Sequence, residues 1–529
     1  MNKRIIHTVF EQQAVLAPES IAVKQGYRQL TYRELNERAN VLAHTLRRLG
    51  LARETAACTL MPPGSNLITS LLAIFKAGGI YMPLDVAFPV KNLRQSLLDT
   101  GTDYCIADGT WLEQVQQLLL SPGMTVKYLF ILNENASFEV FLRGNNGFEQ
   151  VKVEETPIEN PVLINEPKDG NYIFYSSGST GDGKAILGCH DSLSHFIHWE
   201  LKEFSIQSSL RSGQLSQHTF DASMRDIFVP LSAGATLCIP PTGTKESLPA
   251  LVQWMQDESI MLIHTVPSMF RVIARELLNS EQAAEGVRRH LAYVFLAGEH
   301  IYVQDILQWK KAVGEAVEFI NLYGATEVTM AKTFNRIKSI PANAQASAPV
   351  HAGKPISNAA IAVVNDGMIC SIGEIGEIYI ITPFITKGYY KNAEKTAQAF
   401  VQNPLVQDRQ EIVYRTGDYG RYLPEHNIEV LGRIDDQVKV NGIRVELTAV
   451  KQAVLRYKGI KETEIIAHKD AQLQVSLICY FVGDVDVNDM RAFLAGELSR
   501  AVVPSYFIPL DEFPLTINGK VDKKMLPKP

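Results

Sequence analysis

The chain has 529 residues, a length that allows several domains or one large domain with a smaller companion. Hydrophobic residues make up 46% and charged residues 20% of the sequence, which is globular composition and excludes a disordered chain. With 51 Lys and Arg against 57 Asp and Glu, the formal net charge is −6, so no basic footprint predicts nucleic-acid binding.

The six cysteines are scattered and form no Cys-x-x-Cys pair, which argues against a disulfide scaffold and against a structural zinc site. The N-terminus lacks the apolar core of a signal peptide, and no apolar run approaches the ~20 residues of a membrane helix. We therefore expect reduced, mostly buried thiols in a cytoplasmic protein that does not enter a membrane.

The first two thirds of the chain alternate between helical and strand patterns. Thr31 and Glu34 have the spacing of a capping box, and apolar residues then recur at helical spacing up to Gly50, a candidate C-cap. Further elements are predicted as a strand at 55–60, a helix at 67–76 and strands at 172–175, 291–296 and 317–320. This order predicts an α/β fold, with a large N-terminal domain of mostly parallel sheets and helices.

The C-terminal part differs in its pattern. Strands are predicted at 463–467 and 475–482 and a helix at 490–498, an order that fits a small α+β domain better than another βαβ layer. The boundary is predicted in the charged stretch Gly432–Asp436. We expect a large domain of residues 1–434 and a small one of residues 435–529.

A glycine-rich segment from Tyr175 to Lys184 follows a predicted strand. Its glycines allow close backbone approach, and its hydroxyls and lysine suit phosphate oxygens. A Walker A loop is the weaker interpretation, because Ala185 stands where that loop needs Ser or Thr for Mg²⁺. The candidate phosphate-binding residues are Ser176, Ser177, Gly178, Ser179, Thr180, Gly181 and Lys184.

Several further motifs occur in a fixed order: Leu30-Thr-Tyr-Arg-Glu-Leu35, Lys76 to Asp85, Phe220-Asp-Ala-Ser223, Asn321-Leu-Tyr-Gly-Ala-Thr-Glu327, Gly376-Glu-Ile-Tyr379, Tyr414-Arg-Thr-Gly-Asp418, Gly432 to Lys439 and Asn518-Gly-Lys520. With them the chain resembles, from about residue 7 to residue 523, the amino-acid adenylation domains of nonribosomal peptide synthesis in the ANL superfamily. It departs from them at Gly183 and Ala185, where the family has Pro and Gly around the lysine, and at Ala325, where the family prefers Pro.

The resemblance implies that ATP and an amino acid form an aminoacyl adenylate and pyrophosphate, and that the thiol of a phosphopantetheinylated carrier protein then takes the aminoacyl group. It implies catalytic roles for Lys520, Thr326 and Lys184, with Mg²⁺ held by Glu327 and a hinge at Asp435. Tyr323 would stack on adenine, and Asp418 would bind the ribose diol as an acceptor, with Arg433 assisting. The remaining nucleotide-binding residues implied are Gly298, Glu299, Asn321 and Gly324.

The resemblance also implies an amino-acid pocket. Asp221 would pair with the substrate ammonium, which favours an α-amino acid over a fatty or aryl acid. The other pocket positions implied are Ala222, Arg225, His264 or its neighbour Thr265, Phe295, Ala297, Leu322, Met330 and Ala331. The apolar members favour proline, as in stand-alone prolyl adenylating enzymes, whereas an unpaired Arg225 would favour an acidic amino acid.

Two alternatives from other function classes stay open at this point. An acyl-CoA synthetase would use coenzyme A as the thiol, but Asp221 argues against it. A non-enzymatic scaffold is disfavoured because Lys184, Glu327, Asp418 and Lys520 are all present. Since no carrier-domain motif follows Lys520, we expect a separate carrier protein as the partner of a stand-alone enzyme.

Overall fold

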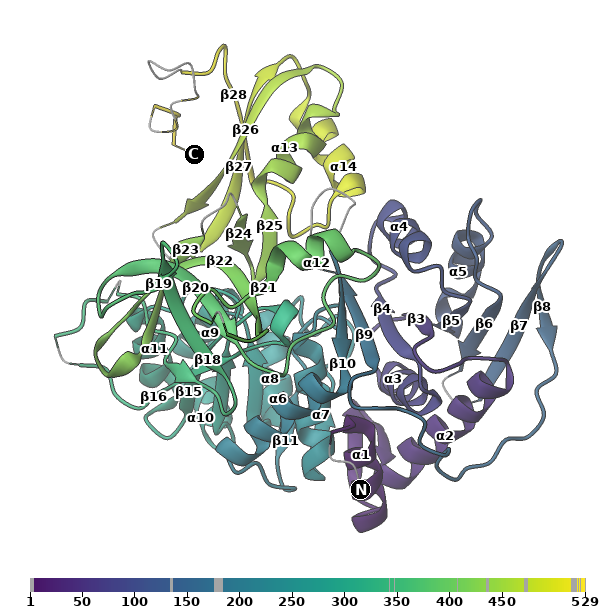
Figure 1. Ribbon diagram of the computed structural model, residues 1–529. Helices are drawn as coiled ribbons and strands as arrows, with labels where there is room; N and C mark the ends of the chain where they lie inside the picture. Colours follow the sequence, from purple (N-terminus) through teal and green to yellow (C-terminus); the bar gives the residue numbers. More distant parts are fainter. Residues whose placement is uncertain are drawn as a thin grey trace.

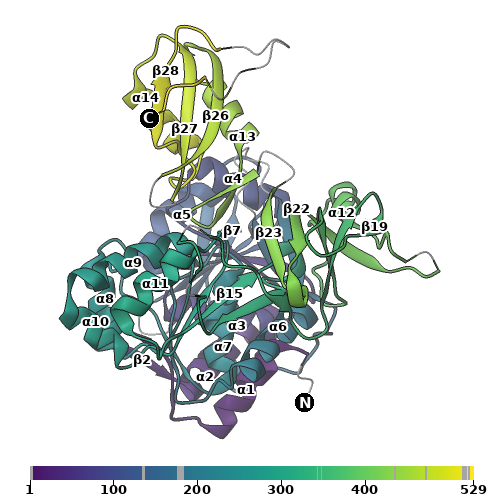
Figure 2. The same cartoon turned by 90° about the vertical axis from the view of Figure 1, so that its left-hand side faces the viewer.

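The computed structural model describes residues 4–133, 137–175, 184–341, 343–346, 348–406, 408–433, 437–470, 474–514, 521, 523 and 525–528. Its N-terminal part contains two mainly parallel sheets flanked by helices, together with an antiparallel sheet. A smaller C-terminal body stands out from them (Figure 1). The view in Figure 2 shows the same separation from the side.

The first sheet is parallel in its middle. Its strands lie in the order β17 (Lys354–Pro355), β16 (Thr333–Ile337), β15 (Glu318–Tyr323), β14 (Tyr293–Leu296), β13 (Leu262–Thr265), β11 (Arg211–Gly213), β12 (Thr236–Cys238), β1 (Ile21–Gln25) and β2 (Arg28–Thr31). Antiparallel pairing occurs toward the two ends, at β1 with β2 and from β15 through β16 to β17.

The second sheet has the same plan. Its order is β10 (Ala185–Cys189), β9 (Gly170–Tyr175), β4 (Ile80–Leu84), β3 (Ala56–Leu60), β5 (Tyr104–Asp108), β6 (Tyr128–Leu132), β7 (Phe138–Gly144) and β8 (Gly147–Val151). Strands β9, β4, β3, β5 and β6 pair in parallel, as the sequence pattern predicts.

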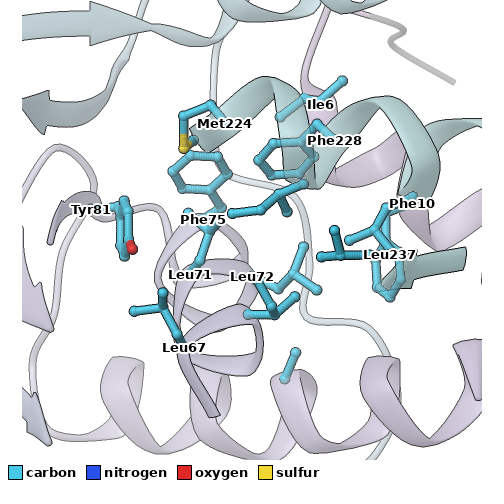
Figure 3. Close-up of a cluster of buried hydrophobic side chains, with 14 of the residues drawn as sticks. Ile6, Phe10, Leu67, Leu71, Leu72, Phe75, Tyr81, Met224, Phe228 and Leu237 are labelled. Carbon is cyan, nitrogen blue, oxygen red and sulfur yellow. The ribbon is translucent and has the colours of Figure 1, made fainter. Parts of the chain in front are cut away.

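Helices cover both sheets and bury apolar faces between them. They are α1 (Ile6–Leu16), α2 (Tyr32–Arg48), α3 (Ser65–Ala77), α4 (Val90–Thr100), α5 (Leu112–Leu119), α6 (His190–Glu203), α7 (Ala222–Ala233), α8 (Leu248–Asp257), α9 (Pro267–Asn279), α10 (Glu281–Arg288) and α11 (Val303–Val313). In the largest core cluster, Phe75 of α3 stacks on Phe228 of α7 with ring centroids 5.8 Å apart (Figure 3). This contact fixes α7, which begins at the predicted substrate-binding motif.

The third sheet is antiparallel, which the sequence pattern did not predict. It contains β18 (Ala360–Asn365), β19 (Met368–Ile369), β20 (Ile375–Ile381), β21 (Phe400–Gln402), β22 (Ile412–Tyr422) and β23 (Ile428–Arg433), with α12 (Ala393–Ala399) beside it. Short 3₁₀ turns follow one strand of each sheet: η1 (Gly109–Trp111) after β5, η2 (Thr326–Val328) after β15 and η3 (Pro424–His426) after β22.

The C-terminal body has its own apolar core. It begins with the hairpin β24 (Gln437–Val440) and β25 (Ile443–Glu446), continues with α13 (Leu447–Leu455), and ends with β26 (Ile460–Lys469), β27 (Val475–Gly483), α14 (Val487–Glu497) and β28 (Tyr506–Pro509). The two strands and the helix predicted here are therefore confirmed. Asp435, the predicted hinge, lies outside the described residues, so the domain boundary remains a prediction.

Several local predictions are also confirmed. Thr31 and Glu34 form a reciprocal capping box at the start of α2, and Gly50 follows that helix with φ +94°. The cysteines are free and buried: Cys58, Cys105, Cys189, Cys238, Cys370 and Cys479. Among the described residues, no helix is long and apolar enough to cross a membrane.

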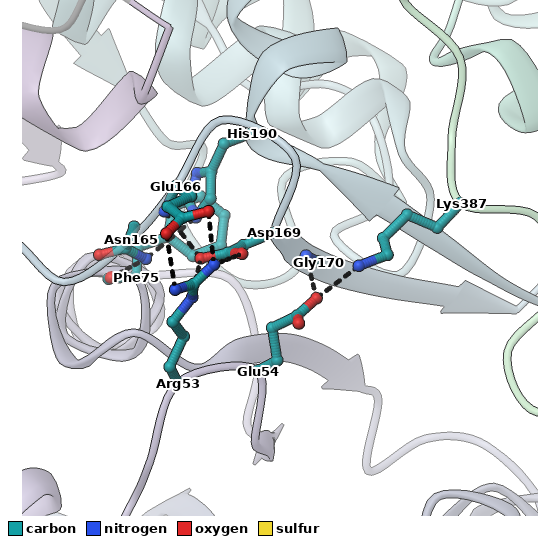
Figure 4. A network of polar contacts seen from close by, with 9 residues as sticks. All are labelled: Arg53, Glu54, Phe75, Asn165, Glu166, Asp169, Gly170, His190 and Lys387. Atoms are coloured by element: carbon teal, nitrogen blue, oxygen red, sulfur yellow. Dashed lines mark hydrogen bonds and ion pairs between the residues drawn. The ribbon is translucent and has the colours of Figure 1, made fainter.

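A polar network holds the start of β9 in place (Figure 4). The Arg53 guanidinium donates to both carboxylate oxygens of Asp169, each at 2.6 Å. Glu54 accepts from the Gly170 N–H at 2.8 Å and from the Lys387 ammonium at 2.6 Å. The network anchors the strand whose other end leads into the glycine-rich segment.

Candidate functional site

The predicted site residues follow the carboxyl ends of β13, β14 and β15, which pair in parallel. Parallel strands bring such ends to one edge of a sheet, where α/β enzymes bind their ligands. The amino end of α7, with Asp221 as its N-cap residue, lies beside the segment that follows β15, because Thr326, Met330 and Glu327 all influence the pKa of Asp221. The chain order therefore gathers the substrate and nucleotide motifs at one place.

Three residues predicted to bind the nucleotide contact each other directly. The Tyr323 hydroxyl donates to Oδ2 of Asp418 at 2.6 Å, and Arg433 Nη1 donates to Oδ1 of Asp418 at 2.9 Å. Asp418 and Arg433 face each other across β22 and β23. Burial, followed by the charge of Asp418, raises the pKa of Tyr323 well above its ordinary value. The three residues form a rigid acceptor site that fits a ribose diol.

Asp221 presents a carboxylate oxygen without a partner. Its Oδ2 is buried and has no hydrogen-bond partner in the described part of the chain. Burial raises the pKa of Asp221, and the charge of Glu327 adds to this, whereas hydrogen bonds from the Thr326 hydroxyl and the Met330 N–H act in the opposite direction. A buried carboxylate left in this state is complementary to a cation such as a ligand ammonium.

The turn after β15 is tightly packed and strained. A Cβ atom on Gly324 would lie 2.3 Å from the Met330 carbonyl oxygen and 2.6 Å from the Ala331 Cα, so only glycine fits there. Thr329 and Met330 have φ values of +62° and +64°, which side-chain-bearing residues rarely adopt. Such strain is typical of functional sites, where it fixes the direction of backbone groups.

Glu327, the predicted Mg²⁺ ligand, is 1% exposed and lies on η2. Its Oε1 accepts a hydrogen bond of 2.9 Å from the Tyr389 hydroxyl. Its carbonyl oxygen accepts from the Thr386 hydroxyl at 2.7 Å. A single oriented carboxylate fits Mg²⁺, which is usually held by one or two carboxylates together with water and phosphate oxygens. The described residues contain no cluster of three His, Cys, Asp or Glu that could form an all-protein metal site.

The register of the first sheet decides between His264 and Thr265 as the wall residue. His264 pairs with Phe295, and Phe295 pairs with Ile320, so the three side chains lie on one face of the sheet. Ala297 and Leu322 have the same alternation and belong to this face. His264, rather than Thr265, is therefore on the side of the predicted pocket.

His264 also belongs to a buried triad that the sequence did not reveal. Its Nδ1 lies 2.8 Å from Asp226 Oδ1 and its Nε2 lies 2.8 Å from Glu200 Oε1, and all three side chains are fully buried. Both ring nitrogens are thus engaged within the protein. The polar atoms of His264 are consequently directed to Glu200 of α6 and Asp226 of α7.

Arg225 lies on α7, one turn after Asp221, and is 3% exposed. Its Nε is buried without a hydrogen-bond partner, and within the described chain no ion pair reaches its guanidinium. The remaining predicted wall residues, Ala222, Met330 and Ala331, are buried or half-buried near these groups. The residues predicted to line the amino-acid pocket therefore combine apolar side chains with one carboxylate and one buried cation.

The side chains of two residues predicted to bind the nucleotide form hydrogen bonds with backbone groups of the protein. Asn321 donates to the Val350 and His351 carbonyls at 3.1 and 3.0 Å. Glu299 accepts from the Ser268 N–H at 3.0 Å and, through its other oxygen, from the N–H of Gly442 in the β24–β25 turn. If Asn321 and Glu299 bind the nucleotide as predicted, they would have to do so through their backbone N–H or C=O groups.

The C-terminal body thus contacts the site. Besides the Glu299–Gly442 bond, Lys184 forms an ion pair of 3.2 Å with Glu446 of β25. Gly298, with φ +97°, lies against Gly442, since a Cβ there would be 3.6 Å from the Gly442 Cα. The predicted residues Ser176, Ser177, Gly178, Ser179, Thr180, Gly181 and Lys520 lie outside the described residues.

Comparison with known proteins agrees with this geometry. A model of the AMP-binding enzyme family matches residues 10–390. Gramicidin S synthase 1 of Brevibacillus brevis is 33% identical over 530 residues, which cover 99% of this chain and 44% of that protein. Tyrocidine synthase 2 of Brevibacillus parabrevis is 34% identical over 525 residues, or 98% of this chain and 14% of that protein.

Solved structures show the same fold. The fused adenylation-PCP di-domain NpsA-ThdA from Klebsiella oxytoca has a TM-score of 0.79 at 22% identity, covering 95% of this chain and 93% of that chain. PA1221, which contains adenylation and PCP domains, has a TM-score of 0.78 at 21% identity, covering 98% and 83%. The chain belongs to the AMP-binding enzyme family. It spans less than half the length of the curated relatives named here.

Proposed function

We propose that this chain activates an amino acid with ATP as an aminoacyl adenylate and then passes the aminoacyl group to the phosphopantetheine thiol of a carrier protein. The observation that carries the proposal is the unpartnered, buried Oδ2 of Asp221 beside Thr326 and Glu327. A ligand ammonium at that oxygen would complete the missing ion pair. The position also lies next to the turn that connects to the Tyr323–Asp418–Arg433 group.

The proposed reaction has two steps. An oxygen of the substrate carboxylate attacks the α-phosphorus of ATP, and the bond to pyrophosphate breaks. In the second step the carrier thiol attacks the acyl carbon, loses its proton and releases AMP. Both steps concentrate negative charge around phosphate, so oriented donors and cations supply most of the stabilisation.

Different side chains would bind the different parts of the two substrates. Asp418 and Arg433 orient the ribose, Tyr323 supports Asp418, and Asp221 holds the amino group. Lys184 and Lys520 are the predicted cations at phosphate and carboxylate. Mg²⁺ held by Glu327 would neutralise phosphate charge when ATP is bound.

The candidate substrates are proline and an acidic amino acid. The sequence favours proline, and proline requires that Arg225 point into solvent or pair with a carboxylate of the protein. Arg225 is buried instead, and no carboxylate pairs with it in the described chain. This observation favours the acidic alternative.

The test is amino-acid-dependent exchange of labelled pyrophosphate into ATP, measured over a panel of amino acids, fatty acids and aryl acids. We expect exchange with an α-amino acid and transfer to a phosphopantetheinylated carrier protein. Exchange driven only by fatty or aryl acids, with coenzyme A as the acceptor, would instead identify an acyl-CoA synthetase and refute the proposal.

A further inference from the structure

Two buried cations, Arg225 and Lys332, lie in the layer between the first sheet and helices α6 and α7. Arg225 is 3% exposed and Lys332 is fully buried. No ion pair joins either side chain to a carboxylate among the described residues. Burying a cation without a partner is costly, so the placement of Arg225 calls for an anionic partner, whereas the Lys332 ammonium already feels the charge of Asp221.

The position of Arg225 on α7 shows which face of the helix carries it. Its predecessor Met224 packs into the core around Phe75 (Figure 3). Its successor Asp226 contacts His264 on the pocket face of β13. Arg225 lies between these two directions and four residues after Asp221, so it shares a helix face with Asp221, one turn deeper.

Lys332 reaches the same layer from the sheet. Phe334 pairs with Leu322 across β15 and β16, and Lys332, two residues earlier, has the same alternation. Its ammonium lies 5.9 Å from the Phe196 ring of α6 and donates one long hydrogen bond, 3.3 Å, to the Thr329 carbonyl. Burial lowers the pKa of Lys332 to about 7, while the charges of Cys189 and Asp221 act in the opposite direction.

Two carboxylates on the helices α6 and α7 are engaged at least in part by His264. Asp226 accepts from His264 and from the Ser216 N–H at 2.9 Å. Glu200 binds His264 through Oε1, although its Oε2 is buried without a partner. Among the described residues, Glu200 and, while no ligand ammonium is bound, Asp221 are therefore internal competitors for Arg225, because each keeps a buried carboxylate oxygen without a partner. The experiment must separate both from a ligand.

We propose that the pocket binds an α-amino acid with an anionic side chain. Arg225 would form a bidentate pair of hydrogen bonds with the side-chain carboxylate, and Lys332 would supply a second positive charge. This inference rests on the proposed function, because Asp221 must hold the amino group. Arg225 and Lys332 are thus specificity-determining residues. An acidic side chain would give Arg225 an anionic partner.

Pyrophosphate exchange with isosteric pairs tests the charge directly. We expect glutamate or aspartate to drive exchange at least tenfold better, in kcat/KM, than glutamine or asparagine, and far better than proline. Arg225→Leu should lower kcat/KM for the acid by about 10²–10³, and Lys332→Met by about tenfold, with the loss mainly in KM. Lys310→Met, which removes the same charge from the distant helix α11, should leave kinetics unchanged.

Binding of AMP to each variant, measured by calorimetry, shows that the protein is folded. Should Arg225→Leu fail to fold, two measurements still test the inference. They are the kinetics of Arg225→Gln and, in the unaltered protein, the ratio of kcat/KM for an acidic amino acid to kcat/KM for its amide. Exchange with proline or another neutral amino acid, retained in the Arg225 variants, would overturn the inference and assign Glu200 or Asp221 as the partner of Arg225. Absence of exchange with every amino acid, despite AMP binding, would refute the proposed function itself.

Discussion

The Tyr323 hydroxyl and the Asp418 carboxylate are joined by a hydrogen bond of 2.6 Å between two different sheets. Tyr323 ends β15 of the first sheet, whereas Asp418 lies within β22 of the third. The bond therefore fixes the predicted ribose acceptor relative to the predicted adenine platform. It joins two predicted nucleotide-binding residues that are 95 positions apart in the sequence.

Removing this bond should weaken nucleotide binding. Tyr323→Phe keeps the ring and deletes the donor to a charged group, a bond worth about 1.5–3 kcal/mol. We expect the KM for ATP to rise by about tenfold, with the KM for the amino acid almost unchanged. Steady-state kinetics with each substrate varied in turn check this. An equal rise in both KM values would show general damage to the site.

Asp221→Asn should abolish recognition of the amino group. The change retains the shape of the side chain but removes the charge from a desolvated pair, which typically costs about 3–5 kcal/mol. The expected loss in kcat/KM for the amino acid is on the order of 10²–10³. AMP binding should persist, because the nucleotide uses Tyr323, Asp418 and Arg433. Unchanged exchange in Asp221→Asn would place the ammonium elsewhere.

Gly324→Ala should damage the site without unfolding the protein. The added Cβ would meet backbone atoms of Met330 and Ala331, which cannot move as freely as a side-chain end. We expect at least a tenfold loss in kcat/KM together with a small fall in Tm. The matched control is Gly314→Ala, where no atom lies within 4 Å of the new Cβ, although its φ of +82° adds local strain. Full activity in Gly324→Ala would contradict the packing.

The buried His190 should make stability depend on pH. Burial lowers the pKa of His190 to about 4, against 6.5 for an exposed histidine, and neighbouring Asp169 and Glu54 offset this in part. Because the unfolded chain binds the proton more readily, the stabilisation is complete above pH 6.5 and is lost as pH falls toward 4. The difference is roughly 3 kcal/mol.

Urea unfolding at pH 7 and pH 5 measures this effect, with His190→Asn as the comparison. The variant should lose part of the fall in unfolding free energy between the two pH values. A second buried histidine, His7, whose pKa is also lowered, lies 5.7 Å away and will contribute the remainder. An identical pH slope in the variant and the parent would rule out His190 as a cause.

Local signals predicted the elements well. The reciprocal contact of Thr31 and Glu34 lies within one turn of chain, so the sequence determines it almost alone. The antiparallel sheet around β20 and β22 was missed, because alternation of helix and strand patterns says nothing about sheets whose strands lack intervening helices. The motif residues Asp418 and Arg433 were found, although only the structure showed Tyr323 bonded to Asp418.

The contacts missed at the site join residues that are distant in sequence. Glu200, Asp226 and His264 come from α6, α7 and β13, and no local pattern links them. A signal was nevertheless present, since Arg225 and Asp226 are charged residues inside an otherwise apolar helix. Lys332 next to the predicted wall residue Ala331 is a second case. Charged residues in apolar segments deserve the same weight as motifs.

The Gly442 amide has a further consequence through its bond to Glu299. A Cβ on Gly442 would lie 2.4 Å from Val266 Cγ1, so this turn is pressed against the N-terminal part in the arrangement described. Its proton is held by a carboxylate that belongs to the other body. Deuterium uptake at the Gly442 amide therefore reports whether the two parts are in contact: we expect slow exchange while they touch and fast exchange once they separate.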